Sequence, residues 1–183
     1  MVISSNVYSL DHFAADVRAV VDRKLGDMQT VEEITPLLNR IVSRPDCLAD
    51  RAGPADPDKG FDIYTSDDLS ILGIVWQPNR GTGLHNHNGW AMVGVVKGHE
   101  RNTSYHRKDD GATPWQVKLE EAETIDVMPG ESAYILPPND IHAVTIPSGK
   151  TLAIHVYGTD IRRQWRCTFD VTTGKVSPFY MTT

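Results

Sequence analysis

The strongest constraint on the fold is an alternation of short β-favouring runs with turn sequences, which extends from Phe61 almost to the end of the chain. The runs are rich in Val, Ile, Tyr, Trp and Thr and read FDIYT, LSILGIVW, WAMVGVVKG, NTSYHR, WQVKLEE, ETIDVM, SAYILP, HAVTIP, TLAIHVYG, QWRCTFDV and KVSPFY. Turn sequences such as PNRGTG, KDDGATP, PPND and TTGK separate them. Many short strands at this spacing predict an all-β sandwich or barrel, and they exclude a parallel sheet with crossover helices.

Residues 1–50 follow helical spacing instead. One apolar stripe consists of Leu10, Phe13, Val17, Val20 and Val21. Ser9 or Asp11 is available as the N-cap of this helix. A second stripe predicts a helix from Val31 to about Ser43, where Thr30 and Glu33 have the spacing of a capping box. We expect both stripes to pack against the β-rich part.

The segment RPDCLADRAGPADPDKG, rich in proline and aspartate, interrupts the periodicity between these two parts and is interpreted as a connector. The sequence therefore predicts an N-terminal helical segment at residues 1–50 and a β-barrel at residues 51–183. Together they form one structural domain, as expected for a chain of 183 residues.

The composition excludes several classes of partner. The net charge of −6 at pH 7 argues against nucleic acids and anionic membranes, because phosphate groups are bound by clustered Lys and Arg. Only two cysteines are present, Cys47 and Cys167, so a secreted disulfide framework is not expected. The N-terminal sequence lacks the pattern of a signal peptide, and no apolar run is long enough to span a bilayer. We expect a cytoplasmic protein, monomeric or a small homo-oligomer.

A pair of histidines, His85 and His87, follows a turn-rich segment in the sequence GLHNHNGW. On a strand, side chains two residues apart point to the same face, so the two imidazoles would converge and Asn86 would point away. Two converging imidazoles predict part of a metal site that a third ligand completes. The alternative interpretation is a pair of solvated loop histidines.

The sequence around this pair resembles the first motif of the cupin superfamily, in which HxH is followed by a Glu and then a Gly. Gly98 occupies the Gly position, whereas Ala91 stands at the Glu position. The stretch GESAYILPPNDIHAV resembles the second cupin motif, with Gly130, Pro137 and His142 at its Gly, Pro and His positions. The resemblance covers about the last two-thirds of the chain. It implies a cupin double-stranded β-helix, a jelly-roll barrel, with the N-terminal helices packed on it.

The block IHVYG, followed by a short loop and arginines, resembles the thiol dioxygenase branch of the cupins, which contains cysteine dioxygenase and the bacterial 3-mercaptopropionate dioxygenases. This resemblance implies that His85, His87 and His142 bind Fe(II). It also implies that His155 and Tyr157 support catalysis, although Ala153 stands where the family has Ser.

The same resemblance implies an arginine that binds the substrate carboxylate. By position this is Arg166, with Arg162 and Arg163 as rivals. The region before the histidine pair offers Asp67 and Asp68, not the arginine that animal cysteine dioxygenase uses there. The expected activity is therefore oxidation of a small thiol acid, 3-mercaptopropionate in preference to cysteine, to its sulfinate with O₂.

Two other functions are compatible with the same residues. One is another three-histidine cupin oxygenase, for example one that cleaves a carbon–carbon bond in a chelating diketone. The other is a non-catalytic cupin that binds a metal and a small ligand. Three histidines and a water also form a common zinc site, so the residue types alone leave the metal open.

Overall fold

The computed structural model describes residues 7–49, 60–113 and 115–180, and it contains two N-terminal helices and eleven strands. The helices are α1 (Leu10–Asp22) and α2 (Asp27–Val42). The strands are β1 (Gly60–Ser66), β2 (Leu69–Trp76), β3 (Gly81–His85), β4 (Ala91–Lys97), β5 (Glu100–Arg107), β6 (Leu119–Val127), β7 (Ser132–Ile135), β8 (Ile141–Thr145), β9 (Thr151–Tyr157), β10 (Trp165–Phe169) and β11 (Val176–Tyr180). The expected boundary between residues 50 and 51 lies outside the described residues.

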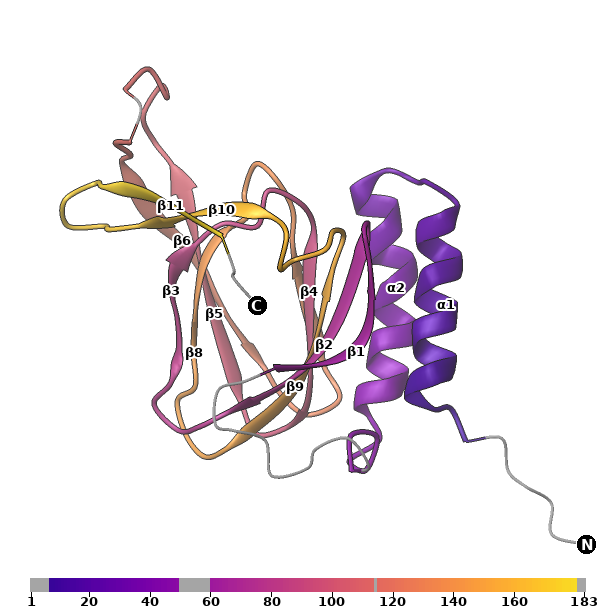
Figure 1. Cartoon of the computed structure of the whole chain (residues 1–183). Helices are drawn as coiled ribbons and strands as arrows, with labels where there is room; N and C mark the ends of the chain where they lie inside the picture. Colours follow the sequence, from indigo (N-terminus) through magenta and orange to yellow (C-terminus); the bar gives the residue numbers. More distant parts are fainter. Residues whose placement is uncertain (1–6, 50–59, 114, 181–183) are drawn as a thin grey trace, which may run out of the picture.

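The strands form two facing antiparallel sheets, shown in Figure 1. One sheet has the order β1-β2-β9-β4-β7 and the other the order β11-β10-β3-β8-β5-β6. Strands distant in sequence lie next to each other in both sheets, as in a jelly roll. The expected all-β core is confirmed: the two sheets form a jelly-roll arrangement with two helices packed on its outside.

The helices cover one face of the five-stranded sheet (Figure 1). Helix α2 packs on β4 and β7, and α1 packs on β1 and β2. Phe13, Val17, Ile34 and Leu38 are fully buried in this contact and join one core with β2, β4 and β9. Burial of each such side chain contributes roughly 1.5–3 kcal/mol to stability, so the packing of the helices on the barrel is a substantial part of the fold.

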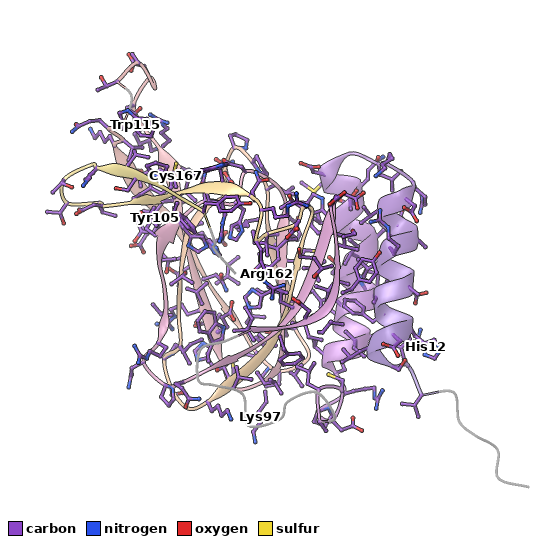
Figure 2. All side chains as sticks on the ribbon, in the orientation of Figure 1. His12, Lys97, Tyr105, Trp115, Arg162 and Cys167 are labelled. Atoms are coloured by element: carbon purple, nitrogen blue, oxygen red, sulfur yellow. The ribbon has the colours of Figure 1, made fainter. Side chains whose placement is uncertain are left out.

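Of the two expected N-cap candidates, Ser9 caps α1, and its hydroxyl accepts a hydrogen bond from the backbone N–H of His12. His12 lies on the side of α1 that faces away from the barrel (Figure 2). The prediction for the start of α2 is wrong. That helix begins at Asp27 with Gly26 as N-cap, so Thr30 lies within its first turn. The Thr30 hydroxyl donates to the Gly26 carbonyl instead of capping.

Two strand predictions also need correction. WQVKLEE and ETIDVM were expected as separate runs, but the part from Leu119 to Val127 is one continuous strand, β6, paired with β5. The turn sequence PNRGTG contains the start of β3. Gly81, with φ of 156°, approaches the Val144 carbonyl so closely that a Cβ would clash with it. Glycine therefore permits strand pairing at that position.

None of the helices in the described part of the chain has the length and apolar character needed to cross a membrane.

Candidate metal centre

Three imidazoles meet inside the barrel. His85, the last residue of β3, lies directly opposite His142 of β8 in the antiparallel register of the six-stranded sheet. His87 follows two residues after β3. One ring nitrogen from each histidine lies within 4.8 Å of the others, and all three side chains are buried. The structure thus brings together the three residues that the sequence suggested as metal ligands.

His87 reaches this cluster by a turn, not by strand alternation as predicted. Its backbone N–H and that of Asn88 both donate to the Asp140 carboxylate, at 2.9 and 2.7 Å. Asn88 has φ of 53°, a left-handed conformation that asparagine tolerates better than most residues. Asn86 points away and pairs with the backbone of Cys167 on β10. The Asp140 carboxylate therefore replaces strand pairing as the support for this ligand.

On two of the three rings, Nδ1 is the nitrogen that contacts a hydrogen-bonding group outside the cluster. The Nδ1 of His85 donates to the Gly83 carbonyl at 2.8 Å, since a carbonyl can only accept. The Nδ1 of His142 lies 3.0 Å from the side-chain oxygen of Asn102. Such partners on the second ring nitrogen orient metal-binding histidines and set their tautomer. The Nε2 atoms of His87 and His142 face each other at 3.0 Å.

The ring of His87 is held differently. Its Nδ1 is buried without a hydrogen-bond partner. The ring stacks on Tyr157, with centroids 5.4 Å apart and planes inclined by 20°. The third ligand is therefore positioned by packing against an aromatic side chain of the opposite sheet.

The three imidazoles are neutral at pH 7. Burial lowers the pKa of His85 to about 4 and holds the pKa values of His87 and His142 well below their usual range. The charge of the nearby Arg166 lowers the pKa values of all three histidines further. Neutral imidazole is the form that binds metal, so the cluster fits a divalent transition-metal ion. No carboxylate joins the cluster among the described residues. At the position where the cupin motif has Glu, Ala91 is buried in contact with Leu72 and Tyr157.

A second pair of polar side chains approaches from the opposite sheet. His155 and Tyr157 lie on β9, and the Tyr157 hydroxyl is 3.2 Å from the His155 Nδ1. Burial raises the pKa of Tyr157 above its usual value, so its hydroxyl keeps its proton at pH 7. Ala153, on the same strand, is fully buried among valines and offers no hydrogen bond at the position where the thiol dioxygenases that the sequence resembles have Ser.

The three arginines after the IHVYG block have different surroundings. Arg162 pairs with Asp62 at 2.6 Å, and Arg163 contacts Asp67 at 3.4 Å. Arg166, on β10, is only 6 % exposed and packs over the ring of Phe179 at 4.5 Å. Its Nε is buried without a hydrogen-bond partner, and burial lowers its pKa.

None of the carboxylates in the part of the chain that the structure describes pairs with Arg166. Of the two aspartates before the histidine pair, Asp68 is engaged by Arg18 and Lys24 of the helical segment. Asp67 is almost fully exposed. Neither lines the cavity at the histidines.

A cavity of about 820 Å³ connects these groups. Its lining includes the three histidines, Tyr157 and Arg166, together with apolar side chains from both sheets. Arg162, labelled in Figure 2, also reaches the cavity. The arrangement would place a metal held by the three histidines, the Tyr157 hydroxyl and the Arg166 guanidinium around one small molecule.

Three contributors were not identified from the sequence: Asp140, Asn102 and Glu100. The segment HERNTSYHRKDD is rich in charged residues, a composition typical of a solvated strand, yet Glu100 is completely buried and Asn102 contacts His142 of the histidine cluster. One feature of the sequence could have linked two of these residues: Glu100 and Asn102 are two residues apart, so on a strand their side chains share one face.

Fold and site together define a jelly-roll barrel with a buried three-histidine cluster at its centre. No protein-family model matches the chain, and no curated protein matches its sequence. Solved structures with a similar fold include a cupin superfamily protein from Desulfitobacterium hafniense, with 14% identity, a TM-score of 0.42, and coverage of 58% of this chain and 83% of that one.

Two enzymes are also similar in structure. Hydroquinone 1,2-dioxygenase PnpCD, solved with Cd²⁺ and 4-hydroxybenzonitrile, has 6% identity and a TM-score of 0.45, over 57% of this chain and 66% of that chain. An oxalate oxidase bound to glycolate has 16% identity and a TM-score of 0.43, over 62% of this chain and 57% of that one.

Proposed function

We propose that the protein is a mononuclear iron dioxygenase that oxidises a small thiol acid, such as 3-mercaptopropionate, to its sulfinate. The observation that carries the proposal is the position of Arg166, a buried cation with no carboxylate partner among the described residues, in the same cavity as three neutral imidazoles. An unpaired buried charge is costly, so its retention favours a ligand that supplies the missing anion.

The donor set supports the same class of ligand. Three neutral imidazoles leave a divalent ion with its full charge, which favours an anionic substrate that chelates it. When bound, Fe(II) supplies the redox chemistry by which both atoms of O₂ are added to the substrate sulfur, converting the thiol RSH to the sulfinic acid RSO₂H. Other metals that accept imidazole remain alternatives to be tested by reconstitution.

The side chains of the protein have separate roles in this reaction. Arg166 holds the substrate carboxylate by charge-assisted hydrogen bonds and so fixes the end of the molecule away from the sulfur. Tyr157, a protonated phenol stacked on His87, donates a hydrogen bond to the bound substrate or oxygen. The His155 Nδ1 lies 3.2 Å from the Tyr157 oxygen and holds the phenol in place. Because the hydroxyl has only one proton, this nitrogen must donate to the phenol oxygen when the phenol donates to the substrate.

The test is reconstitution with Fe(II) under anaerobic conditions, followed by oxygen uptake and mass spectrometry of the product. We expect 3-mercaptopropionate to gain the mass of two oxygen atoms, with ¹⁸O₂ as the source of both. A His142→Ala variant serves as the matched control and should lose iron and activity together, because two ligands chelate poorly. Sulfinate formation that persists at the full rate without His142 would refute the proposal.

A second candidate is a three-histidine oxygenase that cleaves a chelating diketone. The observation that favours it is the apolar lining of the cavity, which includes Leu72, Ile74 and Val144 and suits an uncharged carbon skeleton. The same reconstituted protein, given acetylacetone, would consume oxygen and release two carbonyl-containing fragments if this candidate is correct. A metal-binding protein without catalytic activity would consume no oxygen with either compound.

A further inference from the structure

Glu100, at the start of β5, is a carboxylate with no solvent exposure. Buried carboxylates are uncommon because removal from water is costly unless several hydrogen-bond donors surround them. A glutamine or an aliphatic residue would occupy a similar volume without a charge. The retention of Glu100 therefore calls for a role that its contacts can explain.

Three side chains converge on this carboxylate. Trp76 donates its indole N–H to Oε2 at 3.1 Å, and Asn102 donates its amide N–H to Oε1 at 3.2 Å. The Nε2 of His155 lies 3.3 Å from Oε2, without the alignment of a hydrogen bond. One carboxylate thus contacts both the partner of Tyr157 and the residue that supports His142.

The branch through Asn102 determines a tautomer. A carboxylate can only accept hydrogen bonds, so the NH₂ group of Asn102 must face Glu100. The amide oxygen of Asn102 then faces the Nδ1 of His142 at 3.0 Å, and this Nδ1 must carry the proton. The Nε2 of His142 is left bare and directed toward His87, as a metal ligand requires.

The branch through His155 reaches the other half of the site. His155 lies between Glu100 and the Tyr157 hydroxyl, with its two ring nitrogens facing one group each. The ring of His155 also lies edge-on to Trp76. Any rotation of the imidazole would therefore separate it from Glu100 and from Tyr157 at once.

We propose that Glu100 is a positioning residue that sets the tautomer of His142 through Asn102 and the orientation of Tyr157 through His155. The part that concerns Tyr157 rests on the proposed function, because only turnover requires the phenol. The part that concerns His142 does not, because metal binding can be measured without any substrate.

The first measurement needs no variant. Nitrogen chemical shifts of the histidine rings in metal-free protein distinguish the two imidazole tautomers. We expect His142, assigned by its loss in His142→Ala, to carry its proton on Nδ1. A wild-type His142 protonated on Nε2 would overturn the proposal, whatever the variants do.

The second measurement uses Glu100→Gln, which keeps the shape of the side chain but can also donate. Either orientation of the Asn102 amide then becomes possible, so we expect a mixture of His142 tautomers. Co²⁺, whose absorption bands report its ligands, should bind roughly tenfold to a hundredfold more weakly. Thermal stability should be unchanged or higher, because a buried charge is removed. A purely structural role predicts the opposite combination: lower stability with normal cobalt affinity and a normal tautomer.

Trp76→Phe is the matched control, since it removes one hydrogen bond to Glu100, keeps an aromatic ring beside His155 and leaves the branch through Asn102 intact. It should leave the tautomer and the cobalt affinity near those of the wild type. Asn102→Ala keeps Glu100 and interrupts only the branch to His142, so it should reproduce the cobalt defect even if Glu100→Gln fails to fold. Equal cobalt affinity in wild type and Asn102→Ala would overturn the proposal.

The two proposals fail separately. If no thiol is oxidised by wild-type protein but the tautomer and cobalt results hold, the proposed function is wrong and the role of Glu100 at His142 stands. If thiols are oxidised but Glu100→Gln matches the wild type in tautomer, cobalt affinity and turnover, the role of Glu100 is wrong and the function stands.

Discussion

Replacement of Arg166 by methionine tests whether its guanidinium binds the substrate. Methionine keeps the apolar stem that packs on Phe179 but removes the charge. A hydrogen bond to a charged group contributes about 1.5–3 kcal/mol, and about 1.4 kcal/mol corresponds to a factor of ten. The Michaelis constant for 3-mercaptopropionate should therefore rise by roughly 10- to 150-fold.

The same substitution should not destabilise the protein. Arg166 is 6 % exposed, its Nε has no partner, and burial already lowers its pKa. Methionine removes this desolvation cost, so we expect the Tm of the metal-free protein to be unchanged or raised. Loss of substrate affinity without loss of stability is the signature of a residue kept for binding.

The assay is steady-state oxygen consumption by iron-loaded protein with 3-mercaptopropionate and with 2-mercaptoethanol, a thiol that has no carboxylate. Only the acid should be affected by Arg166→Met. The control is Arg162→Met, which removes a partly exposed ion pair with Asp62 and should change the Michaelis constant little. An equal effect of Arg166→Met on both thiols, or a larger effect of Arg162→Met on the acid, would refute the reasoning.

Three further predictions follow from the contacts. Tyr157→Phe should fold normally and lower turnover by about tenfold to a hundredfold, measured at saturating substrate, since it removes only the hydroxyl that contacts His155. Gly94→Ala would place a Cβ 2.9 Å from side-chain atoms of Leu38 and Val42 on α2, so it should lower the free energy of unfolding, measured in urea, by about 1–3 kcal/mol. The control is Gly83→Ala, whose Cβ would meet nothing within 4 Å and which should lower that free energy less. His85 has a pKa of about 4 when folded, below its unfolded value of about 6.5, so the unfolded chain binds more protons between these values. The Tm of metal-free protein should therefore be highest above about pH 6.5 and fall toward pH 4, and a flat profile over this range would contradict the buried neutral state.

Local patterns were sufficient for much of the architecture. The alternation of β-favouring runs with turns predicted the all-β core, because strand propensity and turn chemistry depend on neighbouring residues. The helical stripe and Ser9 predicted α1 correctly for the same reason. The second helix begins at Asp27, four residues before the expected Val31. Its N-cap, Gly26, has no side chain that could mark this start in the sequence.

The sequence suggested the three histidines that cluster in the structure, but not the residues that support them. His85 and His87 share a local motif, and His142 was supplied by resemblance. The contacts that hold them come from far along the chain: Asp140 lies 53 residues from His87, and Asn102 lies 40 residues from His142. No local periodicity encodes such pairs.

By itself, the sequence determined the class of fold and the residue types available for chemistry, because strand period, turn residues and the histidine motif are local properties. Only the tertiary structure distinguished Arg166 from Arg162 and Arg163, since the three differ in burial and in the carboxylates that fold against them. It likewise placed Glu100 inside the barrel, where a residue of a charged strand meets Trp76, Asn102 and His155. Burial and charge pairing are properties of the packed barrel, and they decide which polar residues remain available to bind a ligand.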